Sequence, residues 1–368
     1  MSPSLRFPEF TGEWKEERLS EIADIYKGAG ISKDQLSDNG EPCILYGELY
    51  TKYKTETITE VISRTDIDNT KLVRSKANDV IIPCSGETAE DIATARCVIK
   101  DGILLGGDLN IIRLHNYDGS FVSYQLNGKR KYDIAKVAQG VSVVHLYGEH
   151  LKGVKTVNPY LAEQKIISRF LSLIDERIAV QSRLIDRLQS LMIGIAQKIA
   201  HSNKPNVRIS DCLECSSSAL QESEVNKTGK YPVYGANGIV GYIDKYHTQN
   251  EAIYIIKDGS GVGGVSYVTG KCSSTGTLNI LQAKNGHSLK YLYYLLKVFN
   301  FVPYKTGMAI PHIYFKDYGK AKIFCPAYPE QLEYAKLLSS IDGNLRIALD
   351  SLKNFNLQKQ YLLRHMLI

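Results

Sequence analysis

The 368-residue chain lacks the marks of a membrane or secreted protein. No uncharged apolar run approaches the roughly 20 residues that a membrane-spanning helix needs. No apolar segment follows the opening Met1-Ser-Pro-Ser-Leu-Arg6, so we expect no signal peptide. The seven cysteines are scattered and odd in number, which indicates reduced thiols rather than a disulfide framework. We therefore expect a cytoplasmic protein that does not enter a membrane.

Catalytic and cofactor motifs are also missing. The sequence contains no Walker A, H-E-x-x-H or G-x-S-x-G pattern. Residues 259–264 fit G-x-G-x-x-G, but a strand-like segment follows them where a dinucleotide site needs a helix. We predict a glycine-rich hairpin there. Cys212 and Cys215 have no second ligand pair at zinc spacing, so we expect no metal site. Because the catalytic motifs are also missing, we expect no catalytic residue in this chain.

Charge and aromatic content are compatible with nucleic-acid binding without requiring it. The formal charge is +6 and the pI about 8.7, which suits phosphate contact but is shared by many enzymes. There are 24 tyrosines against one Trp and nine Phe. Tyrosine suits polar interfaces because it combines a stacking face with a hydroxyl, although β-rich structure explains it equally well. Without a catalytic set, recognition is favoured over catalysis.

What the chain does contain is one internal repeat. Residues 140–175 align with residues 307–342 at a constant shift of 167, with 11 identical positions. The identities are Gly140/Gly307, His145/His312, Tyr147/Tyr314, Lys155/Lys322, Pro159/Pro326, Glu163/Glu330, Gln164/Gln331, Leu171/Leu338, Ser172/Ser339, Ile174/Ile341 and Asp175/Asp342. Such a duplication predicts two modules, each a globular head followed by a long helix. Two similar heads suit a two-fold-like target, of which duplex DNA is the commonest.

The two heads have the pattern of compact mixed domains. Short β-branched stretches bounded by Gly, Asp or Asn predict strands at 43–46, 79–83 and 109–114, and again at 231–234, 252–256 and 278–281. Residues 124–138 and 289–299 are predicted to be helical. The matched His145 and His312 are interpreted as orienting the loop before each long helix rather than as catalytic groups.

Apolar residues repeat at alternating spacings of four and three in both long helices. This pattern predicts an antiparallel coiled coil. The first series is Ile167, Leu171, Ile174, Ile178, Gln181, Ile185, Leu188, Met192, Ile195 and Ile199. The second is Tyr334, Leu338, Ile341, Leu345, Ala348, Leu352, Phe355, Lys359, Leu362 and Met366. Gln181 and Lys359 either fix the register or lie where the pair splays into solvent.

These features resemble the specificity subunit of type I restriction-modification systems. The resemblance is carried by Phe10-Thr-Gly-Glu-Trp14 with Leu19 and Ile22, by residues 40–50 and by residues 230–238. The helix entry Pro-x(3)-Glu-Gln followed by Ile-Asp, present in both copies, carries it most strongly. The resemblance covers essentially the whole chain.

The resemblance implies a mixed α/β (α+β) fold with a pseudo-two-fold repeat. Two target recognition domains would each read half of a bipartite asymmetric site in double-stranded DNA. They would occupy residues 1–158 and 203–328, and the conserved helices residues 159–202 and 329–368. The helices would dock two methylase subunits, and a motor-nuclease subunit would add cleavage. This chain would bind no cofactor itself, because S-adenosylmethionine, ATP and Mg²⁺ would belong to the partners.

Loop residues at strand ends are the expected DNA contacts, since polar and basic side chains there could reach bases and phosphates. In the first head they are Tyr46, Tyr50, Lys52, Tyr53, Lys54, Ser85, Glu87 and Thr88. In the second they are Tyr234, Asn237, Lys257, Ser260, Thr275, Lys305 and Thr306. Two other functions remain open, a stand-alone DNA-binding regulator and a coiled-coil adaptor that binds only proteins.

Overall fold

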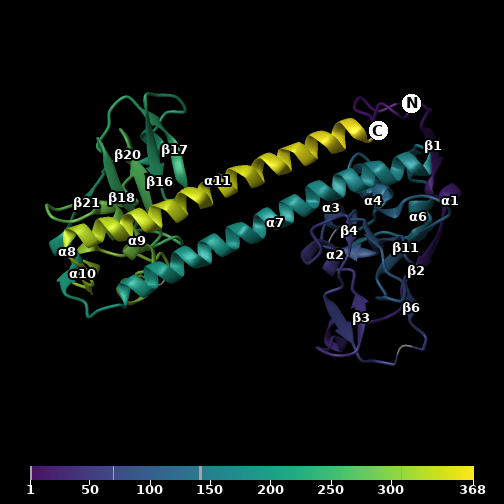
Figure 1. Ribbon diagram of the computed structural model, residues 1–368, viewed down its shortest axis with the longest axis horizontal. Coiled ribbons are helices and arrows are strands. Elements are labelled where there is room, and N and C mark those ends of the chain that lie inside the picture. Colours follow the sequence, from purple (N-terminus) through teal and green to yellow (C-terminus); the bar gives the residue numbers. More distant parts are fainter. Residues whose placement is uncertain (1, 69, 141–142, 308) are drawn as a thin grey trace. The chain divides into compact units, whose positions relative to one another are not determined.

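The computed structural model describes residues 2–68, 70–140, 143–307 and 309–368 (Figure 1). The chain divides into two compact units, Met1–Ser182 with Ser351–Ile368, and Arg183–Asp350. The two longest helices, α7 (Leu161–Ala200) and α11 (Tyr328–Met366), each contribute to both units. The first unit holds the start of α7 and the end of α11, and the second holds the end of α7 and the start of α11. The two helices are therefore antiparallel.

The first unit is built on a five-stranded sheet of order β2-β11-β7-β9-β4. A four-stranded sheet of order β5-β3-β10-β6 and the pairs β1-β13 and β12-β8 accompany it. The strands are β1 (Lys15–Arg18), β2 (Ala23–Lys27), β3 (Glu41–Ile44), β4 (Thr57–Ile58), β5 (Ser63–Thr65), β6 (Val73–Arg74), β7 (Asp79–Pro83), β8 (Ser85–Gly86), β9 (Arg96–Val98), β10 (Leu104–Leu105), β11 (Leu109–Leu114), β12 (Val144–His145) and β13 (Lys155–Asn158). Its shorter helices are α1 (Leu19–Ile22), α2 (Glu48–Thr51), α3 (Ala89–Ile92), α4 (Gly119–Asn127), α5 (Lys131–Val137) and α6 (Gly148–Lys152), with a 3-10 turn at Lys33–Gln35.

The second unit repeats this plan with fewer strands. Its sheets have the orders β15-β21-β18-β19 and β17-β16-β20, beside the pair β14-β22. The strands are β14 (Val207–Arg208), β15 (Leu213–Ser217), β16 (Tyr231–Gly235), β17 (Gly238–Ile243), β18 (Glu251–Ile256), β19 (Val265–Thr269), β20 (Ser273–Ser274), β21 (Leu278–Ala283) and β22 (Lys322–Ile323). The shorter helices are α8 (Ile209–Cys212), α9 (Leu289–Lys297) and α10 (Phe315–Tyr318), with 3-10 turns at Glu222–Glu224 and Val302–Tyr304. The predicted mixed α/β class with two long helices is confirmed.

The helical stretch predicted at 124–138 is divided between two helices. α4 ends at Asn127 and α5 begins at Lys131. Gly128 caps α4, and its N–H donates to the carbonyls of Tyr124 and Gln125. Glycine is the poorest helix former apart from proline, so the chain turns there. The glycine-rich segment 259–264 joins the antiparallel strands β18 and β19, as the hairpin prediction requires.

The Pro-x(3)-Glu-Gln entry holds each long helix to its own head. Gln164 Nε2 donates to the Pro159 carbonyl at 2.8 Å, and its Oε1 accepts from the Asp118 N–H at 2.9 Å. Gln331 makes the same two contacts in the second unit, with Pro326 and Ser288. Asp118 and Ser288 are the N-caps of α4 and α9, so one glutamine joins two helix starts in each copy.

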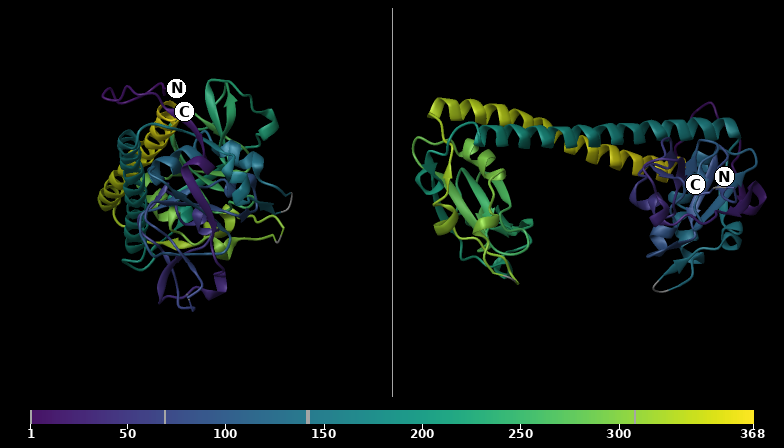
Figure 2. Two further views of the ribbon diagram at one scale, coloured as in Figure 1. Left: turned by 90° about the vertical axis from the view of Figure 1, so that its right-hand side faces the viewer. Right: turned by 90° about the horizontal axis from the view of Figure 1, so that it is seen from below.

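The C-terminal end of α11 completes the core of the first unit. Leu362 and Met366 belong to the same buried cluster as Trp14 of the head and Leu171 of α7. Both views place the last turns of α11 beside the first turns of α7 (Figures 1 and 2). Every member of the two heptad series is buried or partly buried. Lys359, one of its two polar members, is also mostly enclosed and does not project into solvent.

Candidate nucleic-acid interface

Each unit carries one short hairpin just before its last short helix. In the first unit Gln139 and His145 exchange backbone hydrogen bonds of 2.9 and 2.7 Å. In the second unit Thr306 and His312 exchange the corresponding pair, also of 2.9 and 2.7 Å. The duplicated sequence thus produces the same closing pair of hydrogen bonds twice.

Glycine makes these tight loops possible. Gly140 and Gly307 have φ angles of +124° and +84°, a region that side chains strongly disfavour. A Cβ atom at either position would also meet a backbone oxygen, that of Val143 or Ile310. Val143 and Ile310 themselves are 53% and 58% exposed. Each hairpin therefore presents an apolar side chain to solvent.

A flat aromatic surface adjoins each hairpin. The rings of His145 and Tyr147 are stacked at 6.3 Å between centroids, with an interplanar angle of 23°. His312 and Tyr314 repeat this arrangement at 6.4 Å and 25°. Tyr147 is 55% exposed and Tyr314 is 47% exposed. Exposed tyrosines that combine an apolar face with a hydroxyl are typical of wet recognition surfaces.

The hairpins are fixed to the sheet by equivalent backbone contacts. The Leu146 N–H donates to the Cys84 carbonyl at 2.8 Å, directly after β7. The Ile313 N–H donates to the Lys257 carbonyl at 2.9 Å, directly after β18. Each hairpin is therefore anchored next to the end of an equivalent central strand, β7 or β18. A rigid anchor of this kind suits a recognition loop.

The residue beneath the histidine differs between the copies. Ser85 pairs with His145 across the β8–β12 bridge. Asp258 occupies the matching place and its Oδ1 lies 2.7 Å from His312 Nδ1. Lys257 Nζ is 3.9 Å from the other oxygen of Asp258. The second unit thus holds a carboxylate–imidazole pair where the first has a hydroxyl, so the two surfaces differ in charge and hydrogen bonding.

Two predicted DNA contacts of the first head line a cavity. Tyr46 and Lys52 border a hollow of about 1210 Å³ beside the glycine-rich segments at 28–30 and 107. Lys52 Nζ lies 2.6 Å from Glu48 Oε1 and donates to Ser63 Oγ at 2.8 Å. Its charge is therefore already engaged by a carboxylate inside the domain.

The three neighbouring predicted DNA contacts differ in solvent exposure. Lys54 is exposed, and its Nζ donates to the Thr51 carbonyl at 3.0 Å. Tyr50 is partly buried, and burial raises its pKa. Tyr53 is only 6% exposed, its hydroxyl accepts from the Ile62 N–H, and burial raises its pKa to about 12. We correct the expectation for Tyr53, which belongs to the packing of the domain rather than to its surface.

Ser85, Glu87 and Thr88 lie on and just after β8. Ser85 is partly buried, whereas Glu87 and Thr88 are exposed. Thr88 is the N-cap of α3, where its Oγ1 accepts from the Asp91 N–H at 3.1 Å and donates to the Asp91 carboxylate at 2.7 Å. Thr88 therefore has a structural role that the sequence did not reveal.

The candidates of the second head divide in the same way. Tyr234 is partly buried and packs edge-on against the buried Tyr254. Thr275 is 3% exposed and its hydroxyl bonds that of Thr277 at 2.8 Å, which corrects the expectation of a DNA contact there. Lys257 is partly buried, as noted above for its contact with Asp258. The remaining candidates are exposed. Asn237 and Ser260 lie in turns, and Lys305 and Thr306 lie at the start of the second hairpin.

The hairpin tips and their tyrosines were missed as candidate contacts. Tyr147 and Tyr314 are identical across the repeat, two residues after the matched histidines. That spacing was a usable signal, because a strand-like pair at i and i+2 shares one face. Val143 and Ile310 gave no signal, since an apolar residue at a loop tip cannot be told from a core residue by sequence alone.

Comparison with known families gives a match over most of the chain. The family model for the type I restriction modification DNA specificity domain matches residues 11–190 and again residues 202–354. A type I restriction enzyme specificity subunit of Haemophilus influenzae is 25% identical over 123 residues, 33% of this chain and 32% of that protein. The EcoprrI specificity subunit of Escherichia coli is 25% identical over 112 residues, 30% of this chain and 28% of its own length. The matched part thus spans about a third of these relatives.

Solved structures share the fold along the whole chain. The S subunit of a type I restriction-modification system from M. genitalium aligns with a TM-score of 0.73 at 18% identity, covering 100% of this chain and 99% of that one. A chain from a study of assembly and conformational transition in a type I R-M system aligns with a TM-score of 0.54 at 13% identity. It covers 96% of this chain and 97% of its own length. At such identities the likeness concerns the fold.

Proposed function

Because the chain belongs to the family of type I restriction modification DNA specificity domains, we propose that it selects the DNA target of such a system. In this proposal the head at residues 1–158 reads one half of a bipartite site in double-stranded DNA and the head at 203–328 reads the other. The observation that carries the proposal is the duplicated hairpin, which presents the same His–Tyr stack in both heads. The residue beside the histidine is Ser85 in the first head and Asp258 in the second. Two surfaces with similar geometry and different hydrogen-bonding groups suit an asymmetric target.

DNA contact would use the hairpins together with exposed lysines. Val143 and Ile310 offer apolar side chains of the kind that contact thymine methyl groups in the major groove. Lys54 and Lys305 lie on exposed loops and would contact phosphates, which position a protein without reading sequence. The duplicated tyrosines would lie between these two kinds of contact.

The long helices offer apolar faces for partner subunits. In the first unit Ile166, Leu173 and Val180 are 40%, 40% and 55% exposed, and their spacing of seven places them on one side of α7. In the second unit Leu184 and Leu191 follow the same spacing at 43% and 50% exposure. Exposed apolar rows of this kind mark interaction sites. We propose that two methylase subunits dock there and bring S-adenosylmethionine, and that a motor-nuclease subunit adds ATP- and Mg²⁺-dependent cleavage.

The proposal requires no catalytic group or cofactor in this chain and places it in the cytoplasm. Among the helices that the structure describes, none is long and apolar enough to cross a membrane. A stand-alone DNA-binding regulator would share the hairpins but work without a methylase. A protein-binding adaptor would use the helices and have no salt-dependent affinity for DNA.

A genome-wide map of N6-methyladenine tests the proposal. Cells without other adenine methylases would express the chain with its neighbouring methylase gene, and a control strain would express the methylase alone. A bipartite methylated motif that appears only with this chain supports the proposal and gives both half-sites. No new mark from a soluble, assembled complex would overturn it. The salt dependence of DNA binding would then separate the regulator from the adaptor.

A further inference from the structure

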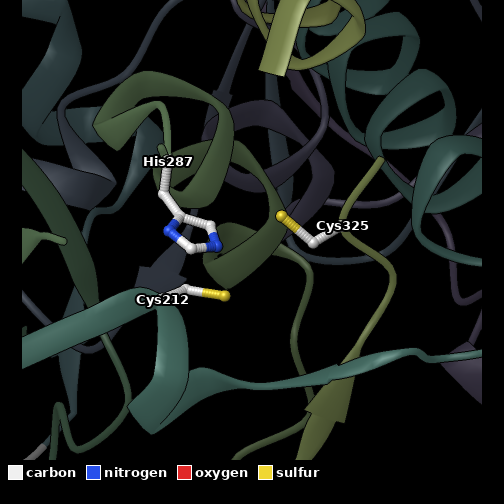
Figure 3. A group of neighbouring side chains, drawn as sticks. All are labelled: Cys212, His287 and Cys325. Atoms are coloured by element: carbon white, nitrogen blue, oxygen red, sulfur yellow. The ribbon is translucent and has the colours of Figure 1, made fainter. Parts of the chain in front are cut away.

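Three metal-ligating side chains meet in the second unit, at a place that the proposed function does not use. Cys212, His287 and Cys325 each offer one ligand atom, and these atoms lie within 4.8 Å of one another. Figure 3 shows both sulfur atoms and one ring nitrogen pointing into the same space. Cys212 is 0% exposed and Cys325 is 8% exposed, while His287 is partly buried. In the part of the chain that the structure describes, no fourth His, Cys, Asp or Glu joins the group.

The three ligands come from separate segments whose backbones are already fixed. Cys212 ends α8, and its carbonyl accepts from the Lys284 N–H at 2.9 Å. His287 lies in the turn before α9, and its N–H donates to the Lys284 carbonyl at 3.2 Å. Cys325 lies between β22 and α11, where the Asn206 side chain bonds both its N–H and its carbonyl at 2.8 Å. Such outer contacts hold ligands in place before a metal binds.

The imidazole of His287 is oriented for coordination through Nε2. In Figure 3 this nitrogen faces the two sulfurs, whereas Nδ1, beside the carbon that carries the side-chain stem, lies on the other side of the ring. Two sulfurs and Nε2 therefore form the possible ligand set. The thiolate is the form of cysteine that binds metals.

The first unit provides an internal comparison. Ile22 matches Cys212, because they end the equivalent helices α1 and α8. Tyr117 matches His287, because each precedes the N-cap of an equivalent helix, α4 or α9. Asn158 matches Cys325 through the repeat shift of 167 residues. In the first unit the Tyr117 hydroxyl and Asn158 Nδ2 both donate to Glu17, at 2.9 and 3.1 Å. The fold therefore does not require the Cys-His-Cys set, which exists in one copy only.

We propose that Cys212, His287 and Cys325 bind one thiophilic divalent cation, most simply Zn²⁺, with water as the fourth ligand. Cysteine and histidine are the preferred zinc ligands, and three protein ligands with water complete a tetrahedral site. The ion links the end of α8, the turn before α9 and the segment that enters α11. It therefore stabilises the second head at the start of its long helix. Cys215 is not part of the site, because it lies in β15 with its Sγ 3.7 Å from the Ser216 carbonyl.

Metal content and spectroscopy of the full chain test this proposal. The reduced protein is saturated with Zn²⁺, desalted and measured by elemental mass spectrometry, alongside Cys212→Ser, Cys325→Ser and the matched control Cys215→Ser. We expect about one zinc per chain in the natural protein and in Cys215→Ser, and near-complete loss in the other two variants. Equal loss in Cys215→Ser, or no stoichiometric zinc in the natural protein, would overturn the proposal.

Two further readouts do not depend on Cys212→Ser or Cys325→Ser being folded. Cobalt(II) bound to the natural protein should give a thiolate-to-metal charge-transfer band and the visible absorption of a tetrahedral site. A spectrum without the charge-transfer band would exclude cysteine ligands. A chelator should lower the midpoint of thermal unfolding of the natural protein and of Cys215→Ser. An unchanged midpoint would contradict the stabilising role of the ion.

Discussion

Lys359 Nζ near the end of α11 lies 2.7 Å from Asp175 Oδ1 in α7 and 2.7 Å from Glu56 Oε2 in the first head. The Tyr124 hydroxyl donates to the other oxygen of Asp175 at 2.6 Å. All these groups lie in the first unit, and only 15% of the Lys359 side chain is exposed. The Lys359 ammonium group thus joins α11 to α7 and to the first head.

Replacing Lys359 with Met should destabilise the first unit. Met fits the same space but leaves Glu56 and Asp175 without the cation between them. Removing one partner from a buried ion pair costs about 3–5 kcal/mol. The measurement is chemical denaturation followed by a probe in the first unit, with exposed Lys353→Met on the same helix as control. Equal stability of the two variants would show that the contacts of Lys359 contribute little.

The same network predicts a pH-dependent contribution from Glu56. Burial by itself would raise the pKa of Glu56, but Lys359, aided by Arg96, holds the pKa below its ordinary value. A carboxyl with a lowered folded-state pKa stabilises the fold above its unfolded pKa of about 4.3, and this stabilisation is lost as the pH falls. Glu56→Gln should therefore be less stable than the natural protein at pH 7. Unfolding measured from pH 7 to pH 3 should show the difference closing. A constant difference would exclude this role for Glu56.

Each hairpin tyrosine should act on one half-site only. Tyr147→Ala should weaken recognition of the half-site read by the first head, and Tyr314→Ala that of the other. Loss of a stacking contact costs about 1–3 kcal/mol, so affinity should fall about 5- to 150-fold. Binding of the assembled complex to DNA with one half-site scrambled at a time measures this. Tyr246→Ala, an exposed tyrosine outside the hairpin, is the control. An equal loss of affinity for both half-sites would contradict the proposal that each head reads one half-site.

Exposed lysines should contribute a salt-dependent, sequence-independent share of affinity. Lys54→Glu and Lys305→Glu should each weaken binding to all sequences and flatten the dependence of log K on log salt by about one. Lys52→Glu should behave differently, because it also breaks the contacts with Glu48 and Ser63 and so lowers thermal stability. Titrations over a range of salt concentrations give the slopes. Unchanged slopes for Lys54 and Lys305 would exclude phosphate contacts at these positions.

The apolar row on α7 should matter for partners and not for DNA. Leu173→Asp places a charge in the middle of this row and should reduce co-purification of the methylase at least tenfold. Lys165→Asp, an exposed position on the same helix, serves as the control. Full co-purification of the methylase with Leu173→Asp would argue against docking on this face.

The sequence alone identified what depends on local patterns. The strands at 79–83 and 109–114 have the predicted bounds, because β-branched residues between turn formers specify strands by themselves. The long helices follow from heptads that repeat over many turns. The duplicated helix entry was sufficient to suggest the family, which the family model confirms.

The tertiary structure decided what depends on contacts between distant segments. Lys359 looked like a defect in a heptad, and only the fold showed that Glu56 and Asp175 enclose it. Tyr53 and Thr275 have the residue types of loop contacts, yet the fold buries both. Cys212 has only Cys215 as a nearby ligand in the sequence, whereas the fold brings it beside His287 and Cys325. Sequence patterns record neighbours along the chain, whereas the partners of a buried polar group are set by the path of the whole backbone.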